Sequence, residues 1–169
     1  PFLAAARLDA LLAGALTYLV DERDVRGHDP ALGWLHSAAH TADLLKFLAR
    51  NPRLDRDAQE RILAGIAARL ATADEVFTHG EDDRLCRVVL SILARDDYDE
   101  ELLFDFLTAL QVQQRRRAVV DDFDAAAHRG RQNGLNLLRV LYVALVLEDQ
   151  TAAHIEAARA AVLRTLKSF

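Results

Sequence analysis

The sequence has few of the residues that form disulfides or end helices in a small protein. It holds one cysteine, no methionine, three prolines and seven glycines among 169 residues. Cys86 has no internal partner for a disulfide, and a lone thiol supplies neither a zinc cluster nor a redox pair. We therefore expect a chain from a reducing, cytoplasmic compartment.

Long apolar runs are also missing. The longest, at residues 10–20 and 140–147, fall short of the ~20 residues that a membrane-spanning helix requires. No basic segment precedes an apolar stretch, so no signal peptide is visible, and the chain opens at Pro1 without an initiating methionine. We expect no membrane partner, and we expect native residues upstream of Pro1.

An excess of basic charge is absent too. Acidic residues outnumber basic ones by 26 to 21, which gives a net charge of −5. An acidic chain has no overall attraction to a phosphate backbone, so we expect no nucleic-acid partner. The composition, 51% hydrophobic and 28% charged, is typical of a globular protein of single-domain size. We predict one all-helical domain over residues 1–169.

What the sequence does contain is leucine, isoleucine and alanine at the three-and-four spacing of amphipathic helices. Glycine and proline fall between such stretches, at residues 27–30 and 51–52, where they end helices. The predicted fold is all-α with almost no strand: six to seven antiparallel helices in a HEAT-like α-α stack or an irregular bundle. The spacing predicts helices near residues 3–22, 31–50, 55–71, 80–95, 99–113, 135–147 and 151–169, with a break at residues 130–134 and residues 118–128 left open.

The most informative stretch is residues 33–45. At about 100° per residue, His36, His40 and Asp43 share one stripe of the predicted second helix. Two imidazoles at this spacing reach one ion, so the stripe is a candidate site for a divalent metal such as zinc, with Asp43 as third ligand. The alternative is a hydrogen-bonded core network, since Ser37 stands where zinc proteases have their general-base glutamate.

Residues 78–84 form a second polar cluster, at the predicted start of the fourth helix. Glu81 and Asp82 would reach the histidine stripe if the second and fourth helices are neighbours. The alternative is a capping box, in which Thr78 and Glu81 satisfy the free amides of the helix start. Arg84 is then either part of a site or the ion-pair partner that neutralises its carboxylates.

Three other features have simpler interpretations. The pair His28-Asp29 resembles the dyad of metal-dependent phosphohydrolases, but no upstream histidine completes it, and Pro30 favours a turn. The arginines at 115–117 lie close to three aspartates, which is typical of a solvated helix face. Cys86 lies among apolar residues, where we expect a small buried hydrophobe rather than a nucleophile.

Two groups of short motifs resemble a known family. They are Arg26-Gly27, Gly33-Trp34-Leu35-His36, Ala39-His40 and Ala42-Asp43, and then Gly80-Glu81-Asp82-Asp83-Arg84-Leu85. On these motifs most of the chain resembles the bacterial domain-of-unknown-function family 2785, with Leu35 in place of the alanine common there. The resemblance implies no reaction. It implies an all-helical, HEAT-like domain and, if the two regions meet, one pocket formed by Trp34, His36, His40, Asp43, Glu81, Asp82 and Arg84.

Two hypotheses about function remain open from the sequence. The first is a helical-repeat-like binding or scaffolding domain with a polar His/Asp pocket, whose protein or small-molecule partner is not identified. The second is a metal-dependent hydrolase that uses His36, His40 and Asp43, with Glu81 or Asp82 as extra ligand or general base. The two differ in whether the imidazoles and carboxylates converge on one ion.

Overall fold

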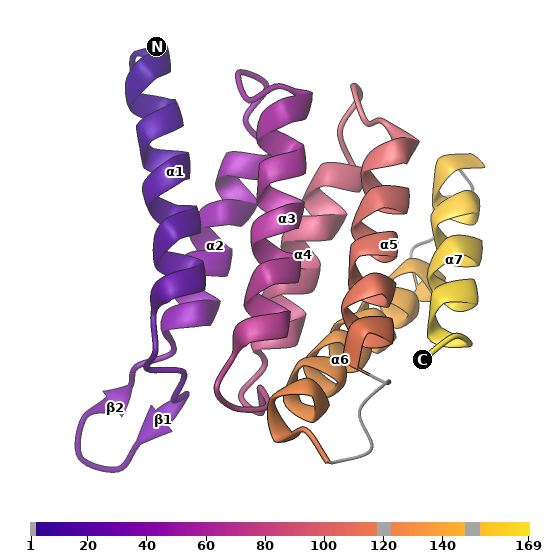
Figure 1. Ribbon diagram of the computed structural model, residues 1–169. Helices are drawn as coiled ribbons and strands as arrows, with labels where there is room; N and C mark the ends of the chain where they lie inside the picture. The colour runs from indigo at the N-terminus through magenta and orange to yellow at the C-terminus, as the bar shows by residue number, and fades with distance from the viewer. Residues whose placement is uncertain (1–2, 118–122, 148–152) are drawn as a thin grey trace.

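The computed structural model describes residues 3–117, 123–147 and 153–169, and these are almost entirely helical. The all-α class predicted from the sequence is therefore confirmed. No helix among these residues is long and apolar enough to cross a membrane. The helices are α1 Ala5–Asp21, α2 Ser37–Ala49, α3 Arg56–Thr72, α4 Glu81–Leu93, α5 Glu100–Arg117, α6 Ala125–Leu147 and α7 Ala153–Leu166 (Figure 1).

The helices are arranged in two rows. Helices α1, α3, α5 and α7 each contact the next in that order and form one row, in front in Figure 1. Helices α2, α4 and α6 form the second row behind them. The core lies between the rows, and each fully buried leucine, isoleucine or valine in it contributes roughly 1.5–3 kcal/mol. Every helix supplies such a side chain: Leu12, Leu45, Ile66, Leu85, Leu110, Leu137 and Val162.

A short hairpin replaces the first two turns of the predicted second helix. Strand β1, His28–Asp29, pairs antiparallel with β2, Gly33–Trp34. The turn forms because the Asp29 carboxylate accepts the backbone N–H groups of residues 31 and 32, each at 2.9 Å, and because Gly33 adopts φ of 80°. The expected helix start at residue 31 is therefore wrong, and α2 begins at Ser37.

The predicted break at residues 130–134 is also wrong, because α6 continues through both glycines. Gly130 and Gly134 are buried, and α6 packs there against α3 and α4. The side chain of Asn133 accepts the backbone N–H of Phe77 at 2.8 Å and donates to the Glu75 carbonyl at 3.1 Å. Close packing and these bonds outweigh the ~1 kcal/mol that glycine costs inside a helix.

Helix α3 begins as the sequence predicts. The side chain of Asp55 accepts the backbone N–H of Ala58 at 3.1 Å, which is a standard N-cap contact. Helix α7 is described from Ala153, so the expected start near residue 151 lies outside the described residues. The open question at residues 118–128 is answered only in part, since α6 includes residues 125–128 and residues 118–122 are not described.

Candidate functional site

The hairpin holds Trp34 at the surface. Its side chain is 61% exposed, although the indole contacts three imidazoles. The ring centroid of Trp34 lies 5.2 Å from that of His28, 5.2 Å from that of His36 and 6.0 Å from that of His79. A large aromatic side chain is thus exposed to solvent and supported from several sides at once.

His36 fixes the junction between the hairpin and α2. It has a left-handed backbone with φ of 49°, which is uncommon for a residue other than glycine. Two backbone bonds hold this conformation: Leu35 N–H donates to the Gly27 carbonyl at 2.9 Å, and His36 N–H donates to the Arg26 carbonyl at 3.0 Å. The sequence places His36 within a helix, whereas the structure makes it the N-cap of α2.

The buried carboxylate of Glu81 joins the hairpin to α4. Glu81 is 1% exposed, and its Oε2 accepts the backbone N–H of His79 at 2.9 Å. Its Oε1 lies 3.3 Å from Nε2 of His36, which is also 2.9 Å from the His79 carbonyl. A buried carboxylate needs such partners, because an unpaired one costs several kcal/mol. This arrangement brings the two motif groups of the sequence into direct contact.

The predicted capping box forms only in part. Gly80, not Thr78, is the N-cap residue of α4, and it has a left-handed backbone with φ of 84°. The Thr78 hydroxyl lies 3.1 Å from Nδ1 of His79 instead of bonding to the helix start. Glu81 does reach back to a backbone N–H, as in a capping box, but to that of His79.

Two residues that the sequence reasoning left out of the site, His28 and His79, complete the support of Trp34. Gly27 is the signal that could have located His79. A Cβ atom at position 27 would lie 2.1 Å from Cγ of His79, so only glycine allows this imidazole to pack there. The resemblance included Gly27, but the spacing alone could not show what it contacts.

An arginine clamp holds the base of the hairpin. The Arg26 guanidinium donates to both carboxylate oxygens of Asp24, at 2.9 and 2.7 Å, and to Asp29 at 2.6 Å. Its hydrogen bonds lower the pKa of Asp24 to about 2. Backbone N–H donors of the turn, with Arg26 nearby, lower the pKa of Asp29 as well. Both carboxylates are therefore ionised at neutral pH, and the hairpin is pinned at its base.

The remaining predicted residues lie alongside. The His40 ring centroid is 5.9 Å from that of His36. Asp43 forms an ion pair with Arg84 and a second one with Lys46 at 3.3 Å, so α2 and α4 are also bridged here. Asp82 makes a local bond, in which it accepts the backbone N–H of Asp83 at 3.0 Å.

The metal site predicted from His36, His40 and Asp43 does not form as a ligand group. Among residues 3–117, 123–147 and 153–169, no three His, Cys, Asp or Glu side chains are grouped so that they could hold one ion. The physical reason is that Asp43 faces two cations while Nε2 of His36 faces Glu81 and a carbonyl. Asp43 and His36 are thus already paired within the protein and do not turn toward a common ion.

Exposed apolar side chains extend from Trp34 along α2. Leu44 and Phe47 follow His40 at positions i+4 and i+7, so they lie on the same side of the helix, and both are exposed. We call Trp34, His36, His40, Leu44 and Phe47 the Trp34 strip. Along α2, the part of the strip from His40 to Phe47 is about 10 Å long, because the helix rises about 1.5 Å per residue.

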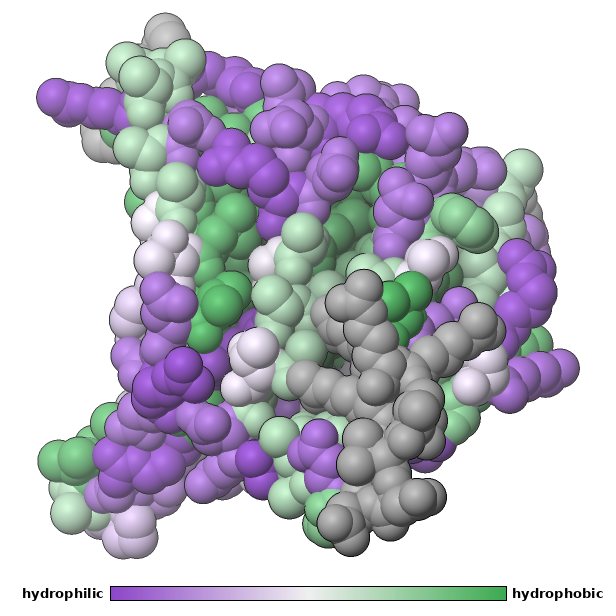
Figure 2. Space-filling model, in the orientation of Figure 1, coloured by the Kyte–Doolittle hydropathy of each residue, from purple (hydrophilic) through white to green (hydrophobic). Residues whose placement is uncertain are grey.

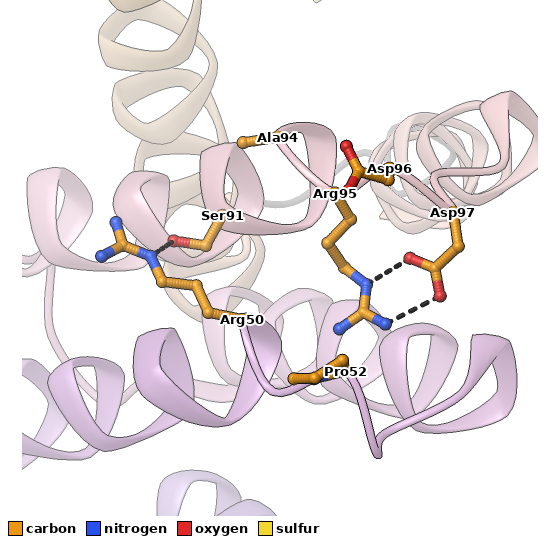
Figure 3. Close-up of a pocket in the computed structure, with 7 residues that line it drawn as sticks. All are labelled: Arg50, Pro52, Ser91, Ala94, Arg95, Asp96 and Asp97. Atoms are coloured by element: carbon orange, nitrogen blue, oxygen red, sulfur yellow. Dashed lines mark hydrogen bonds and ion pairs between the residues drawn. The ribbon is translucent and has the colours of Figure 1, made fainter.

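A separate hollow lies between the C-terminal ends of α2 and α4. It has a volume of about 630 Å³ and is lined mainly by polar side chains. Figure 3 shows that Arg50 and Arg95 point away from each other, and each is already bonded, Arg50 to Ser91 at 3.0 Å and Arg95 to Asp97 at 2.6 Å. The polar groups of this hollow therefore do not converge on a common ligand position.

Comparison with known proteins agrees with the motifs. A family model described as "Protein of unknown function (DUF2785)" matches residues 1–143, a span that includes the hairpin, α2 and the start of α4. No curated protein and no solved structure matches the chain. The chain therefore belongs to the DUF2785 family.

Proposed function

We propose that residues 1–169 form one binding domain, a HEAT-like stack of helix pairs that recognises another protein through the Trp34 strip. The order of contacts supports the repeat, since each row contains every second helix of the chain. A single hydrophobic cluster extending from Leu8 to Val162 supports treating the chain as one domain. The observation on which the function depends is that Trp34 is both exposed and rigidly supported.

The energetics of Trp34 favour binding. Tryptophan is among the residues most enriched where a few side chains dominate an interface, with effects of about 2 kcal/mol or more on truncation. A side chain that is already ordered loses little conformational freedom when a partner binds, which saves about 0.5–1.5 kcal/mol. The Glu81 contacts and the Arg26 clamp supply that order before any partner arrives.

The surroundings of the strip fit a protein surface as partner. Leu44 and Phe47 add apolar area along α2. The pair of Asp43 with Arg84 adds charged groups beside them, in the position of a polar rim. The metal-dependent hydrolase is not proposed, because the described parts of the chain contain no ligand group that would bind the ion.

The test uses Trp34 itself, which is the only tryptophan of the sequence. Wild-type protein and Trp34→Ala serve as baits in extracts of the source cells, and each captured protein is then purified and titrated. We expect wild-type protein to bind at least one captured protein with a blue shift of Trp34 emission, because burial removes water from the indole. We expect Trp34→Ala to weaken that binding by at least about tenfold.

A matched control is Phe123→Ala, which removes another exposed aromatic side chain far from the hairpin in sequence, before α6. Phe123→Ala should bind the partner as the wild type does. Partners that Trp34→Ala and the wild type bind equally, or binding without any change in Trp34 emission, would refute the proposal.

A further inference from the structure

Phe104 lies on α5, in the row formed by α1, α3, α5 and α7, whereas the Trp34 strip lies on the hairpin and α2. Phe104 is 68% exposed and lies between two hollows of about 270 Å³ each, both located between α5 and α7. The two hollows share Phe104, Ala161 and Arg164, so they adjoin at these residues, and we call the two together the α5–α7 groove. Figure 2 shows this face, where apolar surface lies in recesses between the front helices and hydrophilic residues border its upper edge.

Apolar side chains form much of the lining of the groove. Buried Leu103 and Leu107 of α5 form part of its lining. Between His154 and Arg164 the α7 side chains that line the groove are small: Ala157, Ala158 and Ala161. Small residues permit another backbone to approach closely, and Phe104 then offers a large apolar anchor beside it.

One end of the groove is acidic. Glu100 and Glu101 line it at the start of α5. Arg56 reaches Glu101 at 3.2 Å, but the same guanidinium also serves Asp99 at 2.6 Å and Glu60 at 3.2 Å. The start of a helix carries only about half a positive charge. Arg56 is shared among three carboxylates, and Glu100 adds a fourth, so the described residues at this end keep a net negative charge.

A basic residue lies farther along the groove. Arg164 follows His154 by ten residues along α7, about 15 Å at 1.5 Å per residue. Arg164 lines both hollows, so this basic group lies where they adjoin, about three helical turns beyond His154. A docked helix has carbonyls with partial negative charge at its C-terminus, and those carbonyls would meet Arg164.

The walls decide the conformation of the occupant. Both sides of the groove are α-helices, whose backbone groups bond within the helix and offer no sheet edge. An extended peptide would find no main-chain partners there, whereas a helix satisfies its own backbone and presents one apolar face. A helix with basic side chains beside that face matches the carboxylates.

We propose that the α5–α7 groove binds a basic amphipathic helix of a partner protein, with Phe104 as the main apolar contact. This surface is separate from the Trp34 strip and does not depend on it.

The probe is a synthetic, helix-forming peptide of about 15 residues with leucine on one face and lysine on the other. A peptide of the same length with glutamate in place of lysine is the control. Titration into 15N-labelled protein should shift the amide signals of α5 and α7, while emission of Trp34 stays constant. Phe104→Ala should weaken binding at least about tenfold, and Glu100→Gln with Glu101→Gln should weaken it and reduce its salt dependence.

The matched control for Phe104→Ala is again Phe123→Ala, which should bind the lysine peptide normally. Four results would overturn the proposal: no binding at about 1 mM peptide, equal binding of the glutamate peptide, shifts that map to α2 instead of α5 and α7, or a dimer of the free protein that Phe104→Ala converts to monomer. The last result would assign the groove to a second copy of the chain.

Discussion

The neighbouring helices α2 and α4 use polar residues in opposite ways at their C-terminal and N-terminal ends. At one end, Arg95 lies beneath the connectors that follow α2 and α4, and its side chain is 7% exposed. Its guanidinium donates to the carbonyls of Ala49, Asn51 and Leu54 at 2.8, 2.9 and 3.0 Å. At the other end, the buried bonds of Glu81 hold a hairpin whose aromatic residue remains in solvent.

The two ends differ in whether the buried polar contacts simply close on the protein or also support an exposed side chain. Every polar contact of Arg95 closes on the protein, so the large hollow beside it has an architectural explanation. At the hairpin end, Glu81 is likewise buried and bonded within the protein, but its contacts hold Trp34, which is exposed. The exposed part of the indole buries no area within the fold, and this supports the proposal that a partner covers it.

The largest expected effect is at the closed end. Arg95→Ala removes the donors to three carbonyls at the end of α2 and in the connector that follows it, and a buried acceptor left without a donor costs about 1–3 kcal/mol. We expect a loss of about 3 kcal/mol in the free energy of unfolding, measured by urea denaturation. Arg87→Ala, which breaks only a surface pair with Asp83, should cost less than about 1 kcal/mol.

Binding through the Trp34 strip should survive Arg95→Ala in protein that remains folded. If Arg95→Ala is no less stable than Arg87→Ala, the closed end is not an architectural clamp, and the hollow there must be reconsidered as a site.

A smaller loss is expected at the hairpin end. Glu81→Ala removes the acceptor of the His79 N–H and the partner of His36, and we expect a loss of about 2 kcal/mol. The hairpin should also loosen, so the backbone amides of Leu35 and His36, which bond to residues 27 and 26, should exchange faster with solvent. Glu81→Gln keeps one oxygen acceptor and should lose less. Unchanged exchange at both amides in Glu81→Ala would show that Glu81 does not hold the hairpin.

The sequence predicts those parts of the fold that depend on local spacing. The bounds expected for α1, α3 and α4 are within about two residues of those observed, because their apolar positions recur at helical period and Asp55 marks a start. The hairpin was missed because its stability comes from residues distant in sequence, such as His79 packed on Gly27. The continuity of α6 was missed because its glycines are explained only by the helices that pack on them.

The candidate site was predictable to a similar extent. Helical spacing indicates His36 and the capping-box pattern indicates Glu81, and the structure places Nε2 of His36 3.3 Å from Oε1 of Glu81. Spacing could not show which groups face each other, so the stripe of His36, His40 and Asp43 suggested a metal. The structure instead directs Asp43 to Arg84, because the start of α4 brings this arginine beside α2.

The smallest expected loss of stability is at Arg84, which lies close to Glu81 on α4. Arg84 lies three residues after Glu81, but its ion pair with Asp43 is partly exposed, and Lys46 remains near that carboxylate when Arg84 is removed. Exposed pairs contribute little after solvent screening, so Arg84→Ala should lower the free energy of unfolding by less than about 1 kcal/mol, with a smaller difference at high salt. The amides of Leu35 and His36 should exchange as in the wild type. A loss as large as that of Glu81→Ala, or faster exchange in the hairpin, would mean that the ion pair of Asp43 with Arg84 also holds the hairpin. Arg84 would then belong to the support of Trp34 rather than to the surface beside it.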